Sequence, residues 1–218
     1  MSVTSSVFRT TGACAALLAL AACGGGGTPA RAPTPAEFEA VAGDALDQIE
    51  RISSYSRTAF EAMPTTGTAT LRGSGGGLIV IDDATDSNIA IFGRSVLRVD
   101  FETETFSGKV DEMIGASSET NTFAVGGEID FSGGSIGVVA PGETSARPNN
   151  FLVDYDGSIS ADGADYAVDG TAYGQFYGTR VNNQNKSVVK GALLEDPNGT
   201  ATSGGTEYQF VFGASGEN

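Results

Sequence analysis

The chain has 218 residues, of which 27 are acidic and 12 are basic, so its formal net charge at neutral pH is −15. This charge repels phosphate backbones, and we expect no nucleic-acid partner. Histidine is absent, and the only cysteines are Cys14 and Cys23. The commonest general base and metal ligand is therefore missing, and no thiol follows residue 23. The composition predicts a protein that is not an enzyme and holds no cofactor.

The N-terminal segment has the form of a bacterial lipoprotein signal. An apolar stretch from Ala13 to Ala22 follows the single charge of Arg9. It is about 10 residues long, too short to span a membrane but typical of a signal-peptide core. The stretch ends in Leu20-Ala21-Ala22-Cys23, the form of a lipoprotein cleavage box. We expect a signal peptide over residues 1–22 and a lipid on Cys23 that anchors the protein to a membrane. The alternative is an ordinary secretory signal cut near Ala22.

Residues 23–35, rich in glycine and proline, are expected to form a flexible linker. Thr34-Pro35-Ala36-Glu37 then has the pattern of a helix start, with Thr34 as the cap and Glu37 reaching back. Apolar residues at spacings of three and four predict an amphipathic helix over residues 36–54. We expect this apolar stripe to pack on the domain that follows. It comprises Phe38, Val41, Ala45, Ile49 and Ile52.

From residue 66 to residue 214 the sequence pattern changes to alternation of apolar and polar residues, as in Leu97-Arg98-Val99-Asp100-Phe101. A period of two with one polar face predicts antiparallel strands with one side in water. Eight or nine strands are expected, depending on whether residues 78–82 and 89–92 form one strand, two strands or part of a loop. Recurrent glycines on the inward face favour a tightly coiled, closed barrel over a sandwich. The predicted fold class is all-β, a single antiparallel barrel preceded by one helix.

Two groups of aspartates raise the question of calcium, because oxygen-rich turns suit that ion. The first group surrounds Asp154-Tyr155-Asp156-Gly157, where the glycine does not fall at the position that a twelve-residue calcium loop requires. We therefore interpret these residues as solvated turn acids. The two groups are Asp154, Asp156, Asp162 and Asp165, and Asp82, Asp83 and Asp86.

Four segments resemble, in order, parts of the barrel of the transferrin-binding protein B family. They are Asp100-Phe101-Glu102-Thr103-Glu104-Thr105-Phe106-Ser107-Gly108, Gly174-Gln175-Phe176-Tyr177-Gly178, Val189-Lys190-Gly191 and Phe210-Val211-Phe212-Gly213-Ala214. The resemblance covers about residues 66 to 214. It implies an eight-stranded soluble barrel on an outer-membrane lipoprotein exposed at the cell surface. It also implies a ligand such as transferrin, complement factor H, or haemoglobin and haem.

This chain departs from that family in having one barrel instead of two lobes, a short helix in place of the handle domain, and no histidine for haem. We expect a monomer that binds an extracellular protein or a small solute, in iron or nutrient acquisition. One alternative is a structural envelope lipoprotein without a ligand. Another is an integral eight-stranded outer-membrane barrel, which the charged outer rows and the lack of tryptophan disfavour.

Tyr173 and Tyr177 are the candidate ligand-binding residues. They share the polar face of their strand, opposite Phe176, and aromatic side chains on an outer face can anchor a partner. The alternative is that they pack against the N-terminal helix. Residues 181–185 and 195–205 have the polarity expected of recognition loops on a rigid scaffold.

Overall fold

The computed structural model describes residues 31–82, 87–139, 144–181 and 186–218. The expected signal peptide and the expected lipid site Cys23 lie outside the described residues. Residues Ala32–Asn218 form one compact unit. This unit contains every helix and strand described below.

The predicted helix is α1, Pro35–Ser53, and a short 3₁₀ turn, Phe60–Ala62, follows it. Its start is the expected capping box. The Thr34 hydroxyl accepts a hydrogen bond from the Glu37 amide at 3.3 Å, and the Glu37 carboxylate accepts one from the Thr34 amide at 2.7 Å. Within the described part of the chain, no helix combines the length and the apolar character needed to cross a membrane.

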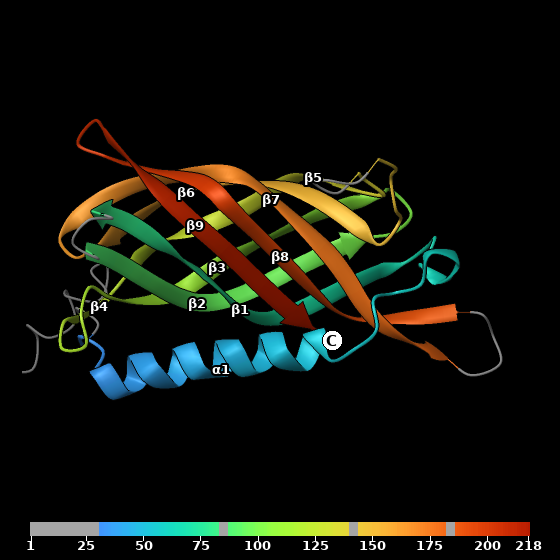
Figure 1. Cartoon of the computed structure of the whole chain (residues 1–218), viewed down its shortest axis with the longest axis horizontal. Coiled ribbons are helices and arrows are strands. Elements are labelled where there is room, and N and C mark those ends of the chain that lie inside the picture. The colour runs from blue at the N-terminus through green and yellow to red at the C-terminus, as the bar shows by residue number, and fades with distance from the viewer. Residues whose placement is uncertain (1–30, 83–86, 140–143, 182–185) are drawn as a thin grey trace, which may run out of the picture. The chain divides into compact units, whose positions relative to one another are not determined.

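A closed, antiparallel, eight-stranded barrel forms the body of the molecule, which confirms the predicted fold class (Figure 1). Each barrel strand pairs with the next along the chain, and β1 pairs with β9 to close the ring. The additional strand β4 pairs only with the end of β3. The strands are β1 Thr68–Asp82, β2 Ser87–Asp100, β3 Thr105–Ala116, β4 Thr122–Ala124, β5 Gly126–Ile136, β6 Asn150–Ala161, β7 Ala164–Val181, β8 Lys186–Ser203 and β9 Thr206–Glu217.

Aromatic side chains fill the barrel interior. The Phe106 and Phe151 rings stack with centroids 4.3 Å apart, and Phe176 lies 4.7 Å from Phe151. Tyr155 and Phe212 make a second contact at 4.5 Å. All five side chains are buried. The interior is thus the hydrophobic core, and the surface available to a large ligand is the outer wall and its loops.

Helix α1 lies against the outside of the barrel, over the seam between the first and last strands (Figure 1). Along this seam the paired register skips two residues on each strand. The Gln48 carboxamide occupies the gap: its nitrogen donates to the Arg72 carbonyl at 3.1 Å, and its oxygen accepts from the Ser74 amide at 2.9 Å and the Ser215 hydroxyl at 2.8 Å. A helix side chain therefore supplies hydrogen bonds that the ladder lacks here.

The prediction of a recognition loop over residues 195–205 is wrong. Strand β8 continues to Ser203, and the chain reverses at Gly204 and Gly205. The residues that suggested a turn, Pro197 to Gly199, form a bulge, a place where a missing amide and a missing side chain are tolerated. Of the other expected loop, residues 182–185 lie outside the described residues.

The bulge turns the Asp196 carboxylate into the barrel. One of its oxygens accepts a hydrogen bond from the Tyr155 hydroxyl at 3.0 Å, and the other accepts one from the Asn198 amide at 2.9 Å. Gly199 makes room for this pair, because a Cβ there would lie 1.9 Å from the Tyr155 hydroxyl. Burial, together with the charge of Asp196, raises the pKa of Tyr155.

Candidate binding groove

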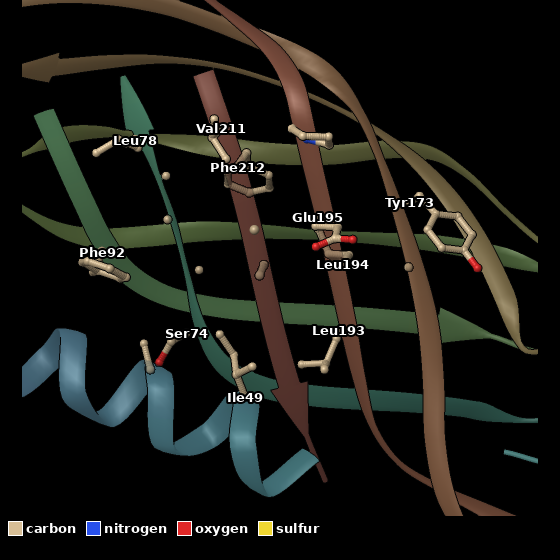
Figure 2. Close-up of a pocket in the computed structure, with 18 of the residues that line it drawn as sticks. Ile49, Ser74, Leu78, Phe92, Tyr173, Leu193, Leu194, Glu195, Val211 and Phe212 are labelled. Atoms are coloured by element: carbon tan, nitrogen blue, oxygen red, sulfur yellow. The ribbon is translucent and has the colours of Figure 1, made fainter. Parts of the chain in front are cut away.

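A groove of about 660 Å³ lies on the outer wall of the barrel, beside α1. Strands β7, β8, β9, β1 and β2 form its floor, and Ala45 and Ile49 of α1 form part of one side. Figure 2 shows Ile49 reaching from the helix, with Phe92 and Tyr173 on opposite sides of the hollow. The groove is therefore bounded by the helix that also covers the barrel seam.

One row of paired residues crosses this floor from strand to strand: Phe92, Gly76, Gly213, Glu195 and Tyr173. The row spans four strand spacings of about 4.8 Å, or about 19 Å from Phe92 to Tyr173. The two glycines in the middle have no side chains, whereas the ends carry aromatic rings. At Gly76 and Gly213 the floor of the groove is therefore bare backbone.

Gly213 is a glycine that the fold does not require. A Cβ added there would meet only the Leu194 carbonyl oxygen, at 3.4 Å, which is an ordinary contact. Gly213 is also absent from the glycines with a positive φ. By contrast, a Cβ on Gly76 would lie 1.9 Å from the Ile91 carbonyl oxygen. Packing explains Gly76, but it leaves the bare position at Gly213 unexplained.

Apolar side chains around the groove are unusually accessible. Val211 is 37% exposed on β9, and Ile49 is 43% exposed on α1. Leu46, three residues before Ile49 on the same flank of the helix, is 64% exposed. Leu78 and Leu193 are half-buried in the lining. Accessible apolar side chains in and next to a hollow are a feature of ligand and partner sites.

The structure brings both predicted residues, Tyr173 and Tyr177, into the lining of this groove. Both are half-buried on the outer face of β7. The Tyr173 hydroxyl accepts a hydrogen bond from the Gln175 side chain at 2.8 Å. At Tyr177, β7 pairs with the segment after α1: Arg57 lies opposite in an isolated bridge, and the Thr58 amide donates to the Phe176 carbonyl at 2.9 Å. That segment therefore fixes the Tyr177 end of the strand.

Other lining residues were not predicted, although the sequence carries a signal for them. Alternation fails where two or three apolar residues follow each other, so that one of them faces outward. This happens at Ile91-Phe92, Leu193-Leu194 and Phe210-Val211-Phe212. In each case the core member is buried and the outward member, Phe92, Leu193 or Val211, lines the groove. The pattern is not specific, because the outward residues Leu152 and Val188 in Phe151-Leu152-Val153 and Val188-Val189 do not line the groove.

A second hollow, of about 310 Å³, adjoins the groove and shares Leu78 and Ala90 with it. It lies by the first turns of α1, where Phe38 meets Phe92 edge-on at 5.7 Å between ring centroids. Three exposed carboxylates line the two hollows, and Arg57 is the single basic lining residue among those described. The carboxylates are Glu39, Glu119 and Glu195.

The aspartates considered for calcium are not gathered into one site. Asp154 accepts a hydrogen bond from Thr171 at 2.7 Å, Asp162 accepts one from Asn121 at 3.2 Å, and Asp165 accepts one from Ser160. Asp83 and Asp86 lie outside the described residues. Among residues 31–82, 87–139, 144–181 and 186–218, no group of three potential metal ligands is close enough to hold an ion.

The fold and the groove together define a class: a closed, meandering β-barrel whose outer wall, next to a docked helix, carries an apolar hollow. No family model, curated protein or solved structure matches this chain.

Proposed function

We propose that this protein is a lipid-anchored binding protein of the bacterial outer membrane, and that it holds a protein or solute ligand in the groove beside α1. The single observation that carries the proposal is the bare position at Gly213. The barrel could accommodate a side chain there, but that side chain would take up space on the floor of the groove. A ligand that occupies this space would explain why residue 213 carries no side chain.

The anchoring part of the proposal is supported by the sequence. The Leu20-Ala21-Ala22-Cys23 box supplies a thiol for acylation, and the glycines after it supply a flexible tether. The resemblance of residues 66 to 214 to the transferrin-binding protein B family supports the outer membrane and exposure at the cell surface. In that family, the ligands are host proteins or haem.

The charges on the outer wall favour a soluble barrel over one embedded in lipid. Lys109, Asp130, Asp156 and Asp169 are register partners in one row across β3, β5, β6 and β7. The three aspartates are exposed. A lipid-facing wall needs an apolar band at this level, and charged residues there are costly. Three of the five large apolar residues that are exposed in the described part of the chain, Leu46, Ile49 and Val211, lie instead in or next to the groove.

The groove also favours a binding protein over a structural lipoprotein without a ligand. A purely structural barrel gains nothing from exposing Leu46, Ile49 and Val211 to water, because burial of such side chains stabilises a fold. Binding is favoured over catalysis because the sequence offers no histidine and no cysteine after residue 23. We propose no cofactor and a monomeric state.

The test is capture of a ligand from growth medium or host fluid by immobilised residues 32–218. We expect a specific protein or solute to be retained by the unaltered domain and lost with Gly213→Leu and Tyr177→Ala. The matched control is Gly126→Leu, since a Cβ at this exposed glycine on β5 meets only the Ser160 Cβ, at 3.7 Å. Retention of nothing, or equal retention by all variants, would contradict the proposed function.

A further inference from the structure

We propose that the element bound in the groove is an amphipathic α-helix of a partner protein, with a basic polar face, lying alongside α1. This inference rests on the proposed function and names the partner chemistry of the same site. Its grounds are the direction of the groove, the exposed flank of α1, the closed edges of the floor strands and the charges of the lining.

The groove runs parallel to α1. The two adjoining hollows are lined by Phe38 and Glu39 near the start of the helix, and by Ala45 and Ile49 farther along. From Phe38 to Ile49 a helix rises about 17 Å, so a partner of about three turns can follow the whole length. Helices pack side by side with their axes about 8–10 Å apart. A second helix would lie next to α1 in this way.

Leu46 and Ile49 are suited to contact a helix in this place. They are separated by three residues, so they lie on one flank of α1, and both are exposed. Ala45, next to them, is buried on the barrel and also lines the groove. The apolar stripe of α1 is therefore wider than the barrel needs, as expected for a helix with neighbours on two sides.

The floor of the groove cannot accept an added strand. Strands β1, β9 and β8 pair on both sides within the closed ring, so none of them offers a free edge. Strand addition requires a free sheet edge, whereas a helix satisfies its own backbone and presents only side chains. The groove, lined by Leu78, Val211 and Leu193, offers apolar contacts of the kind that a helix face fills.

The lining charges select a basic partner. Glu39, Glu119 and Glu195 are exposed along the two hollows, opposed by Arg57 alone among the described lining residues. A second copy of this chain does not fit, because its own helix Pro35–Ser53 carries five acidic residues and one basic residue. Like charges brought together at an interface disfavour association. The complementary partner is a helix with lysine or arginine outside its apolar stripe.

A synthetic leucine–lysine helix of about 18 residues with one tryptophan is the direct probe. The protein has no tryptophan, so any tryptophan emission reports the peptide alone. With residues 32–218, checked first for cooperative unfolding, we expect a blue-shifted emission that saturates and weakens with salt. Gly213→Leu should weaken binding by about tenfold or more, because it fills the groove, while Gly126→Leu should change it less than about twofold.

A second variant tests the groove in case Gly213→Leu fails to fold. A second peptide tests whether any amphipathic helix binds, whatever its charge. Leu46→Ser alters only an exposed residue of α1, and it too should weaken the leucine–lysine peptide. A leucine–glutamate peptide of the same pattern should not bind. The inference is overturned if Gly213→Leu and Leu46→Ser both bind like the unaltered domain, or if the acidic peptide binds equally well.

One further outcome separates this inference from the proposed function. If an environment-sensitive apolar dye binds in a Gly213-dependent way and palmitate displaces it while the leucine–lysine peptide does not, the groove takes an acyl chain. The helix proposal is then wrong, although the proposed binding function stands. If dye, peptide and fluid capture all fail, the proposed function itself is contradicted.

Discussion

The Gln48 carboxamide oxygen accepts a hydrogen bond from the Ser74 backbone amide at 2.9 Å, so a side chain of α1 completes the backbone pairing of the barrel seam. The same oxygen accepts from the Ser215 hydroxyl of the last strand. Gln48 therefore joins the helix, the first strand and the last strand at one point. The helix is in this sense part of the barrel rather than an appendage.

Replacement of Gln48 by leucine should destabilise residues 32–218 by about 1–3 kcal/mol, because the Ser74 amide and the Arg72 carbonyl would lose their partners in a buried place. Urea unfolding followed by circular dichroism measures the change. Asp47→Asn, one position away on the exposed face of α1, should change stability by no more than about 0.5 kcal/mol. Equal stability of Gln48→Leu and the unaltered domain would show that the seam does not depend on this side chain.

Phe176→Ala should cost about 3–5 kcal/mol, the usual effect of removing a large buried aromatic side chain. Phe176 is fully buried between Phe151 and Phe101. Phe92→Ala provides the comparison, because Phe92 is half-buried on the outer wall. We expect a clearly smaller loss of unfolding free energy there. If both substitutions cost the same, the assignment of inner and outer faces would be in error.

Asp156→Asn should stabilise the domain by about 0.2–1 kcal/mol, since like charges directly opposite each other on neighbouring strands are destabilising. Asp156 pairs with Asp130 on one side and Asp169 on the other. The gain should shrink in high salt, which screens exposed charges. Glu207→Gln is the control, because Glu207 is exposed and lies opposite Thr202. A similar gain in both variants would point to net charge rather than to this row.

The raised pKa of Tyr155 leads us to expect that the free energy of unfolding falls at alkaline pH. Burial raises its pKa in the folded protein, whereas the unfolded chain releases this proton near pH 10. Above that pH the unfolded state binds fewer protons than the folded state, so the stabilisation present at neutral pH decreases as pH rises. Thermal unfolding of Tyr155→Phe and the unaltered domain between pH 8 and pH 11 tests this.

We expect the alkaline decline to be shallower in the Tyr155→Phe variant. The variant should also be less stable by about 1–3 kcal/mol at neutral pH, because Asp196 stays buried with one donor fewer. Parallel declines in the two proteins would assign the alkaline transition to other tyrosines.

Cys23→Ser should abolish acylation and leave the precursor uncut, as expected if the Leu20-Ala21-Ala22-Cys23 box is a lipoprotein signal. Labelling with a fatty-acid analogue and intact-mass analysis of the mature protein measure both effects. Cys14→Ser should leave lipid and cleavage unchanged. A mature protein that begins at another residue, or that carries no lipid, would contradict the anchoring proposal.

Much of the fold was predictable because local patterns determine it. The capping box at Thr34 and Glu37 places the start of α1, and alternation of apolar residues places most strands. The closure of β1 on β9 was expected only in general terms, since contacts between Gly75 and Ala214 leave no local signal. The role of Gln48 at the seam was not predicted, because a polar residue beside the apolar stripe of a helix is ordinarily taken to face solvent.

The groove was predictable only in part. Tyr173 and Tyr177 could be placed on an outer face from alternation, but their neighbours across the floor depend on strand register. The loop expected over 195–205 failed because Pro197, Asn198 and Gly199 serve a bulge as readily as a turn. The bulge places Asp196 against Tyr155, a contact between residues far apart in sequence that no local pattern predicts.

The position of the seam has a consequence for biogenesis. Every other barrel pairing joins consecutive barrel strands, whereas the seam joins β1 to β9, the 12 residues of Thr206–Glu217. Contacts of such long sequence separation form slowly. Until the last strand arrives, β1 and β8 each present an unpaired edge that can capture another nascent chain. The barrel therefore has no unpaired strand edge only after β9 has paired with β1 and β8. A truncation that removes β9 should leave an open sheet that is prone to aggregate.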